Sequence, residues 1–165
     1  MVTDIAQTWT FSEEWVPEPE AMAQAREVAL ELGADPLSSG TGSLLRLLAR
    51  AKDARAVVEI GTGAGVSGLW LLAGMNSDGV LTTIDTEAEY QKAARNAFRQ
   101  AAVASHRCRF INDRALNVLP RMAQAAYDMV VIDGPVEEIP QYLDHATRML
   151  RPSGVLVIVV GVGRG

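Results

Sequence analysis

The chain has 165 residues, of which 48% are hydrophobic and 21% are charged, and its formal net charge is -5. This length suits one domain with one continuous core, and the composition argues against disorder. The acidic balance disfavours a general nucleic-acid binder, because phosphate neutralisation requires clustered lysine and arginine. The lone Cys108, the lack of a signal-peptide pattern and the absence of a long apolar run lead us to expect a cytoplasmic protein without a membrane partner.

The first third of the chain is expected to be mainly helical. Residues 1–15 show no hydrophobic period, so we expect them to be irregular or to lie on a partner. Apolar residues recur at helical spacing over 19–32, and Gly33 ends that pattern. Residues 37–42 are expected to form a loop, and the leucine-rich stretch 44–51 predicts a second helix.

From residue 56 onward, short apolar runs alternate with longer helical patterns. The runs are rich in valine and isoleucine, which is typical of strands covered on both faces. They lie at 56–60, 80–84, 108–112, 129–132 and 155–160. Helices are predicted at 65–75, 87–102, 117–125 and 137–150. The alternation predicts one doubly wound α/β domain over 1–165 with a mostly parallel sheet, divided into an N-terminal helical cap (1–53) and a core (54–165).

A glycine-rich turn follows the first predicted strand. In a doubly wound sheet, ligands bind beyond the carboxyl ends of the strands. Here Gly61, Gly63 and Gly65 form a G-x-G-x-G pattern directly before a helix. Glycine allows a tight turn and a close ligand, and the helix start offers free N–H donors. A purely structural turn is the alternative interpretation.

Acidic residues stand at or just beyond the ends of four predicted strands: Glu59, Asp85, Asp113 and Asp133. A buried carboxylate is costly without a partner, so Glu59 is expected to face the amino-acid end of a zwitterionic ligand, or else to serve in a cap or an ion pair. Asp85 could accept two hydrogen bonds from a ribose diol, or could cap the next helix. Four acidic strand ends are hard to explain by packing alone.

Five stretches carry a resemblance to a known family. They are Val-Val-Glu-Ile-Gly-Thr-Gly-Ala-Gly-Val-Ser67, Leu-Thr-Thr-Ile-Asp85, Val-Leu-Pro120, Tyr-Asp-Met-Val-Val-Ile-Asp133 and Leu-Arg-Pro-Ser-Gly154. Together they resemble the class I S-adenosylmethionine-dependent methyltransferases, and more closely the bacterial O-methyltransferases related to catechol and caffeoyl-CoA O-methyltransferases. The resemblance spans about residues 36–160. It implies a Rossmann-like enzyme that uses S-adenosyl-L-methionine to methylate a hydroxyl group of a small molecule.

The resemblance also implies a set of cofactor-binding residues. Those around the methionine moiety would be Leu37, Glu59, Gly61, Thr62, Gly63 and Ser67. Asp85 would hold the ribose hydroxyls, with Thr86 beside the adenine, and Arg114 and Ala115 would line the adenine edge. Relatives usually read Gly-Asp-Ala where this chain reads Asp-Arg-Ala115, so the acidic residue is displaced here.

Asp133 is the predicted catalytic residue and is also placed among the cofactor-binding residues. In relatives the matching acid touches cofactor or substrate and often binds a divalent metal, and here Asp133 would orient or deprotonate the acceptor hydroxyl. Relatives commonly continue as Asp-Ala-Asp-Lys, whereas this chain reads Asp-Gly-Pro-Val136. Metal-binding relatives carry Asp-Asn after strand five, whereas this chain reads Val-Gly-Val-Gly163. Asp133 is therefore the one remaining candidate ligand for magnesium, and most of the expected oxygen ligands are missing.

Two alternative functions are also compatible with parts of the sequence. The missing lysine and acids also fit a catalytically degenerate module that binds S-adenosylmethionine. An NAD(P)-dependent oxidoreductase is disfavoured by Val66, which stands where a third glycine belongs.

The family sheet normally has two further strands, but this sequence stops at Gly165 after the fifth. The last strands are thus apparently missing, and we expect a homodimer through the N-terminal helices or this apolar edge.

Overall fold

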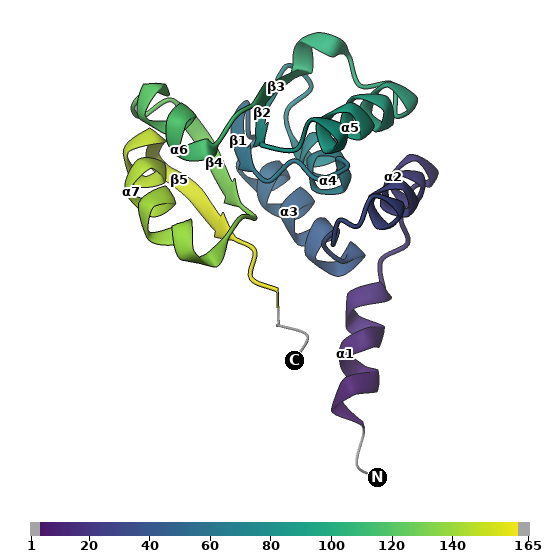
Figure 1. Cartoon of the computed structure of the whole chain (residues 1–165). Coiled ribbons are helices and arrows are strands. Elements are labelled where there is room, and N and C mark those ends of the chain that lie inside the picture. Colours follow the sequence, from purple (N-terminus) through teal and green to yellow (C-terminus); the bar gives the residue numbers. More distant parts are fainter. Residues whose placement is uncertain (1–3, 162–165) are drawn as a thin grey trace.

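The computed structural model describes residues 4–161, and a five-stranded parallel sheet forms its centre (Figure 1). The strands are β1 (Ala56–Ile60), β2 (Val80–Asp85), β3 (Cys108–Asn112), β4 (Tyr127–Ile132) and β5 (Leu150–Ile158). Their order across the sheet is β3-β2-β1-β4-β5, so the direction of strand addition reverses between β1 and β4. Each predicted run overlaps one strand, and the expected doubly wound α/β fold is confirmed.

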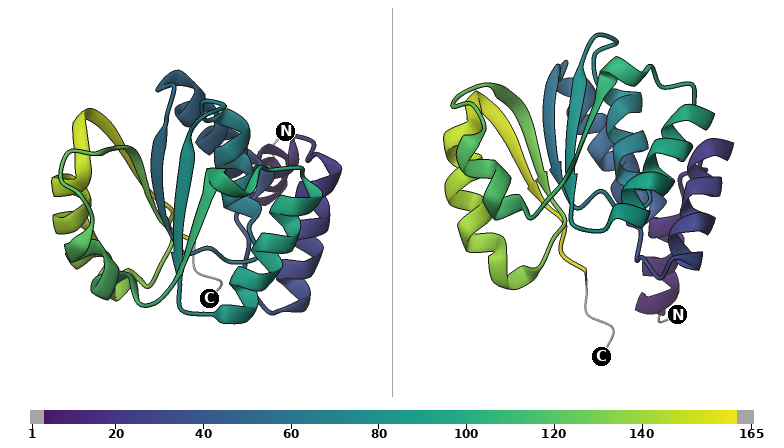
Figure 2. Two further views of the ribbon diagram at one scale, coloured as in Figure 1. Left: turned by 90° about the horizontal axis from the view of Figure 1, so that it is seen from above. Right: turned by 45° about the horizontal axis from the view of Figure 1, so that its top comes forward.

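Helices cover both faces of the sheet (Figure 2). One face carries α2 (Glu20–Glu31), α3 (Ser39–Ala51), α4 (Val66–Gly74) and α5 (Ala88–Gln100). The other face carries α6 (Ala115–Val118) and α7 (Ile139–Met149), together with the 3-10 turns η2 (Leu119–Arg121) and η3 (Val136–Glu138); η1 (Ser105–Arg107) precedes β3. Helix α1 (Ile5–Glu14) projects away from this body beside α3 (Figure 1). None of the helices within residues 4–161 is long and apolar enough to span a membrane.

The central strands divide their side chains between two cores. In β1, Val57 belongs to the core beneath α3 and α4, whereas Val58 belongs to the core beneath α6 and α7. In β4, Met129 and Val130 are divided in the same way, and all four side chains are fully buried. Alternate side chains of a strand point to opposite faces, so a strand covered on both faces is expected to be mostly apolar. This explains the runs rich in valine and isoleucine.

The expectation that residues 1–15 are irregular is wrong for the described part of that segment. Helix α1 begins after Asp4, whose carboxylate accepts a hydrogen bond from the N–H of Ala6 at 3.0 Å. Its large apolar side chains, including Ile5 and Phe11, are exposed. A helix without a buried face shows no hydrophobic period, and for this reason the pattern failed. Residues 1–3 lie outside the described part of the chain.

The expected loop over 37–42 is shorter than predicted. Helix α3 already begins at Ser39, because the hydroxyl oxygen of Ser38 accepts a hydrogen bond from the N–H of Thr41 at 3.1 Å and caps the helix. Gly42 lies inside the helix, where a Cβ atom would stand 2.3 Å from the ring of Trp70. The glycine that suggested a loop instead permits the close packing of α3 on α4.

The helix predicted over 117–125 is also wrong in its extent. Helix α6 ends at Val118 and continues only as the 3-10 turn η2, in which Pro120 has no N–H for an α-helical hydrogen bond. Ala125 then adopts a positive φ of 49°, which an α-helix does not allow.

Candidate functional site

The turn after β1 needs glycine for two different reasons. Gly61 has a φ of 95°, and a Cβ atom on it would lie 2.0 Å from the carbonyl oxygen of Asp133. Gly63 also has a positive φ, but a Cβ atom there would meet nothing within 4 Å. The structural interpretation therefore explains Gly61, whereas the space around Gly63 is open to a ligand.

Backbone hydrogen bonds join the carboxyl ends of three strands. The N–H of Gly61 donates to the carbonyl of Ile84 at 2.9 Å, and the N–H of Asp133 donates to the carbonyl of Ile60 at 2.8 Å. These bonds extend the pairing of β1 with β2 and β4 just beyond the strands. They hold the glycine turn and Asp133 side by side at the point where the strand order reverses.

Two hollows open at this edge of the sheet and share the same three residues, Gly61, Asp85 and Asp133. The first hollow, about 270 Å³, is also lined by four other predicted residues, Leu37, Thr62, Gly63 and Ser67. The second hollow, about 320 Å³, is also lined by the other three, Thr86, Arg114 and Ala115. The structure thus brings together every predicted site residue except Glu59, on two adjoining surfaces.

Glu59 lies behind the wall of the first hollow and is fully buried. Its carboxylate accepts hydrogen bonds from the hydroxyls of Ser67, at 2.5 Å, and Thr83, at 2.7 Å. Burial raises the pKa of Glu59 to about 7, against the opposing effect of these two hydrogen bonds. Of its two hydroxyl partners, Ser67 lines the first hollow, so Glu59 is linked to that hollow through Ser67. Direct contact between Glu59 and a ligand stays a prediction.

Asp85 is oriented by the backbone on both sides of it. Its Oδ2 accepts a hydrogen bond from the N–H of Gly63 at 3.0 Å, and its Oδ1 accepts one from the N–H of Glu87 at 2.9 Å. The second of these bonds supports the turn before α5, so the capping interpretation holds in part. A carboxylate offers about four acceptor positions, which leaves room for a diol as well.

Asp133 lies where the two hollows meet, in an acidic environment. Burial raises its pKa to about 6, and the charges of Asp35 and Asp85 add to that effect. These three carboxylates line the first hollow, and none of the lysine, arginine or histidine side chains described lines it. Such a hollow attracts a cation and repels an anion.

Sequence reasoning missed residues on both surfaces. Asp35 lines the first hollow from the α2–α3 loop, where the available signal was an acidic residue between Gly33 and Leu37. Glu138 and Tyr142 line the second hollow from η3 and α7. No local pattern singles them out, because only the fold brings α7 beside α6.

The second hollow has an ordered polar rim. The guanidinium of Arg114 forms an ion pair with Glu138 at 2.7 Å, and the hydroxyl of Tyr142 donates a hydrogen bond to the same carboxylate. Asp113 accepts hydrogen bonds from the N–H of Arg114, at 2.7 Å, and from the side chain of Asn117, at 2.9 Å. These bonds lower the pKa of Asp113. Asp113, the acidic residue that is displaced relative to the family pattern, therefore supports the start of α6.

No group of three or more histidine, cysteine, aspartate or glutamate side chains within residues 4–161 is arranged to hold a metal ion. Of the stretch Val-Gly-Val-Gly163, for which the resemblance led us to expect no Asp-Asn pair, Val162 and Gly163 lie outside the described residues. The role of Asp133 as a metal ligand stays a prediction.

Comparisons with known proteins agree with the fold and the motifs. A family model described as O-methyltransferase matches residues 12–162. A protein of Mycobacteroides abscessus named "Putative O-methyltransferase" is 51% identical over 143 residues, which cover 87% of this chain and 66% of that protein. A protein of the same name from Mycobacterium tuberculosis is 47% identical, with coverage of 91% and 67%. The chain thus spans about two thirds of the length of these relatives.

Solved structures include similar proteins with bound ligands. The O-methyltransferase TomG of Streptomyces achromogenes, in complex with SAM, is 35% identical with a TM-score of 0.83, covering 93% of this chain and 70% of that one. An O-methyltransferase of Bacillus cereus, in complex with SAH, is 25% identical with a TM-score of 0.82, covering 93% and 71%.

Proposed function

This chain belongs to the O-methyltransferase family, and we propose that it binds S-adenosylmethionine across the two hollows and methylates a hydroxyl group of a small molecule. The observation that carries the proposal is the acidic first hollow, where Asp35, Asp85 and Asp133 stand beside the glycine turn. S-adenosylmethionine presents a sulfonium and an ammonium group, which these carboxylates stabilise. The pyrophosphate of NAD(P) would be repelled by the same carboxylates, which disfavours the oxidoreductase alternative.

The residues present fit this cofactor in its two parts. Leu37, Thr62 and Ser67, with the open backbone at Gly63, would hold the methionine part in the first hollow. Asp85, shared by both hollows, would accept the ribose hydroxyls. The residues for the adenine in the second hollow would be Thr86, Arg114 and Ala115.

Asp133 is the group that we propose to act on the acceptor. When bound, S-adenosylmethionine supplies a methyl group on positively charged sulfur, which a nucleophile displaces in line. With a pKa of about 6, Asp133 is mostly ionised at pH 7 yet more basic than an exposed aspartate. It would orient the acceptor hydroxyl and accept its proton. Pro135 and Val136 follow it and offer no second acid or ammonium group.

We further propose that residues 1–53 act as a helical cap on the core of residues 54–165 and that the protein is a cytoplasmic homodimer. The cap supplies Asp35 and Leu37 to the first hollow. A dimer is supported by exposed apolar side chains on and beside α1, including Trp9 and Trp15. Light scattering on the purified chain tests the assembly, and a monomer mass would contradict it.

Binding and turnover test the proposed activity separately. Calorimetry should give a binding heat with S-adenosylhomocysteine and none with NAD, and methyl transfer from labelled S-adenosylmethionine should follow with a phenolic or catechol acceptor, measured with magnesium and with EDTA. A well-folded chain that gives no heat with S-adenosylhomocysteine would overturn the proposal. Binding without transfer to any acceptor would favour the degenerate module instead.

A further inference from the structure

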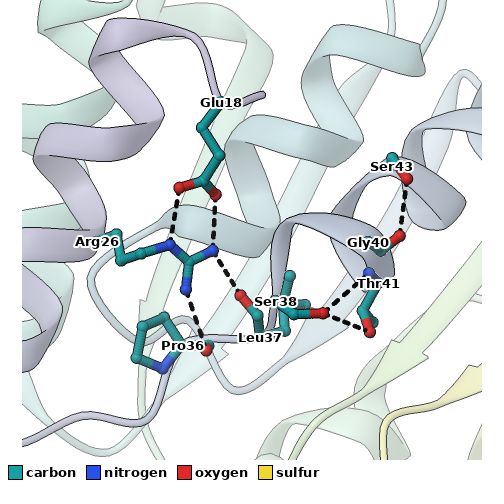
Figure 3. A network of polar contacts seen from close by, with 8 residues as sticks. All are labelled: Glu18, Arg26, Pro36, Leu37, Ser38, Gly40, Thr41 and Ser43. Carbon is teal, nitrogen blue, oxygen red and sulfur yellow. Dashed lines mark hydrogen bonds and ion pairs between the residues drawn. The ribbon is translucent and has the colours of Figure 1, made fainter. Parts of the chain in front are cut away.

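Arg26 and Glu18 form a partly buried ion pair for which the predicted site has no role. Nε of Arg26 lies 2.7 Å from Oε2 of Glu18, and Nη2 lies 2.6 Å from Oε1, so the pair is bidentate (Figure 3). The two side chains are only 24% and 12% exposed. Burying such a pair costs desolvation, which is recovered when the remaining N–H groups also find partners.

Those remaining N–H groups bind the loop between α2 and α3. Nη1 of Arg26 donates to the carbonyl of Pro36 at 3.3 Å, and Nη2 donates to the carbonyl of Leu37 at 2.7 Å. Residues 34–38 belong to no helix or strand. A loop outside the regular elements needs partners for its carbonyl groups, and here one guanidinium supplies two of them.

The same loop forms one wall of the first hollow. Asp35, Pro36 and Leu37 line that hollow together with Thr62 and Asp133. The carbonyl groups of Pro36 and Leu37 thus bind Arg26, while the same two residues line the hollow. The guanidinium thus supports this wall with two hydrogen bonds, beside the side chain of Leu37, which is buried in the core beneath α3 and α4.

We propose that Arg26, held by Glu18, is a positioning residue that fixes the 35–37 loop as a preformed wall of the cofactor site. The inference rests on the proposed function, because it concerns affinity for the adenosyl cofactor. Arg26 lines neither hollow and takes no part in methyl transfer. Without it, only a fraction of molecules would hold the loop in the binding-competent position, and the apparent affinity would fall by that fraction.

Three variants test this role by calorimetry with S-adenosylhomocysteine. Arg26→Met should weaken binding about tenfold, and Arg26→Lys about threefold, because an ammonium cannot bind the carboxylate and both carbonyls together. The double variant Glu18→Gln/Arg26→Met should bind S-adenosylhomocysteine as weakly as Arg26→Met does, and it does not leave the Glu18 carboxylate without its partner. Hydrogen exchange in peptides covering residues 34–41 should be faster in the free variants and should slow when S-adenosylhomocysteine is added.

Arg151→Met is the matched control. Arg151 pairs with Asp128 at 2.6 Å at the starts of β5 and β4, which is the edge of the sheet opposite the hollows. It should lower the thermal midpoint without changing the affinity. The inference would be overturned if Arg26→Met bound S-adenosylhomocysteine as tightly as the unmodified chain, or if Arg151→Met lost as much affinity as Arg26→Met. Either result would leave the proposed function standing. If Arg26→Met does not fold, Glu18→Gln replaces it, and unchanged affinity and exchange in that variant would overturn the inference. No binding by the unmodified chain would overturn the proposed function as well.

Discussion

The two walls of the first hollow are held by different kinds of interaction. The core wall, defined by Gly61, Thr62 and Asp133, is tied to the strand ends by backbone hydrogen bonds. The cap wall, defined by residues 35–37, belongs to no regular element and is bound by the side chain of Arg26. Backbone pairing withstands most side-chain substitutions, whereas a wall held by side chains can be released by one of them. The core wall therefore suits chemistry, and the cap wall suits the adjustment of affinity.

The largest effect is expected where a substitution distorts the core wall itself. Gly61→Ala should lower the free energy of unfolding by about 4 kcal/mol and abolish binding of S-adenosylhomocysteine, because it combines an unfavourable φ with a backbone overlap. Urea denaturation and calorimetry measure the two effects. Gly33→Ala is the control, since Gly33 has a φ of 77° and open space around its Cβ position. It should cost only about 1 kcal/mol, and an equal cost at both positions would refute the overlap at Gly61.

The carboxylate behind the core wall should make stability depend on pH. The pKa of Glu59 is raised from 4.5 to about 7 in the folded chain, so its favourable contribution is complete below 4.5 and is lost as the pH rises through 7. Glu59→Gln should remove about 3 kcal/mol of this decline. Urea denaturation between pH 4 and pH 8 measures the free energy of unfolding of each variant. Asp133→Asn is the comparison, because the pKa of Asp133 is about 6 and its favourable contribution to stability is therefore lost at a lower pH than that of Glu59. A Glu59→Gln curve parallel to that of the unmodified chain would contradict the assignment.

Asp133 tests whether the core wall carries the chemistry. Asp133→Asn should lower kcat about 100-fold, because the variant lacks a proton acceptor at the meeting point of the hollows. Affinity for S-adenosylhomocysteine, whose sulfur is uncharged, should change much less. In the unmodified chain the rate should rise as the pH increases through about 6, since Asp133 acts in its ionised form. Asp144→Asn, on the exposed side of α7, should leave both rate and affinity unchanged, and a similar loss there would argue against a specific role for Asp133.

The smallest effect is expected at the end of the cap wall. Ser38→Ala removes the side-chain cap of α3 and should lower the free energy of unfolding by about 1 kcal/mol. Binding of S-adenosylhomocysteine should weaken slightly, because Ser38 follows Leu37 directly. Ser43→Ala removes a hydroxyl that donates to the carbonyl of Gly40 within α3, and it should be close to neutral. Thermal unfolding measures the stability of both variants. Equal destabilisation would show that the Ser38 cap contributes no more to stability than the Ser43 hydroxyl.

Much of the core wall was predictable because its signals are local. The glycine turn and Asp85 stand directly beside strands whose apolar runs mark their ends, so their neighbourhood follows from a parallel sheet. The roles within the site were not predictable to the same degree. Glu59 stands in the motif yet lies behind the wall, because residue 59 of β1 points into the core beneath α4, where Ser67 binds it.

The cap wall gave little sequence signal of its own, and its one predicted residue, Leu37, came from the family resemblance. Asp35 lies in a loop without a pattern, and Arg26 finds its partners Glu18, Pro36 and Leu37 at separations of 8, 10 and 11 residues, across a turn of the chain. Helix α1 went unrecognised for a related reason, since its apolar side chains meet no core and show no period.

The sequence by itself determined the strands, the glycine turn and the acids at the strand ends, because hydrophobic burial and backbone conformation act between near neighbours. Only the tertiary structure decided which carboxylates face the hollow and which lie behind it. It also decided that Arg26 binds the loop after α2, because the chain must turn back along this helix before the carbonyl groups of Pro36 and Leu37 can reach the guanidinium.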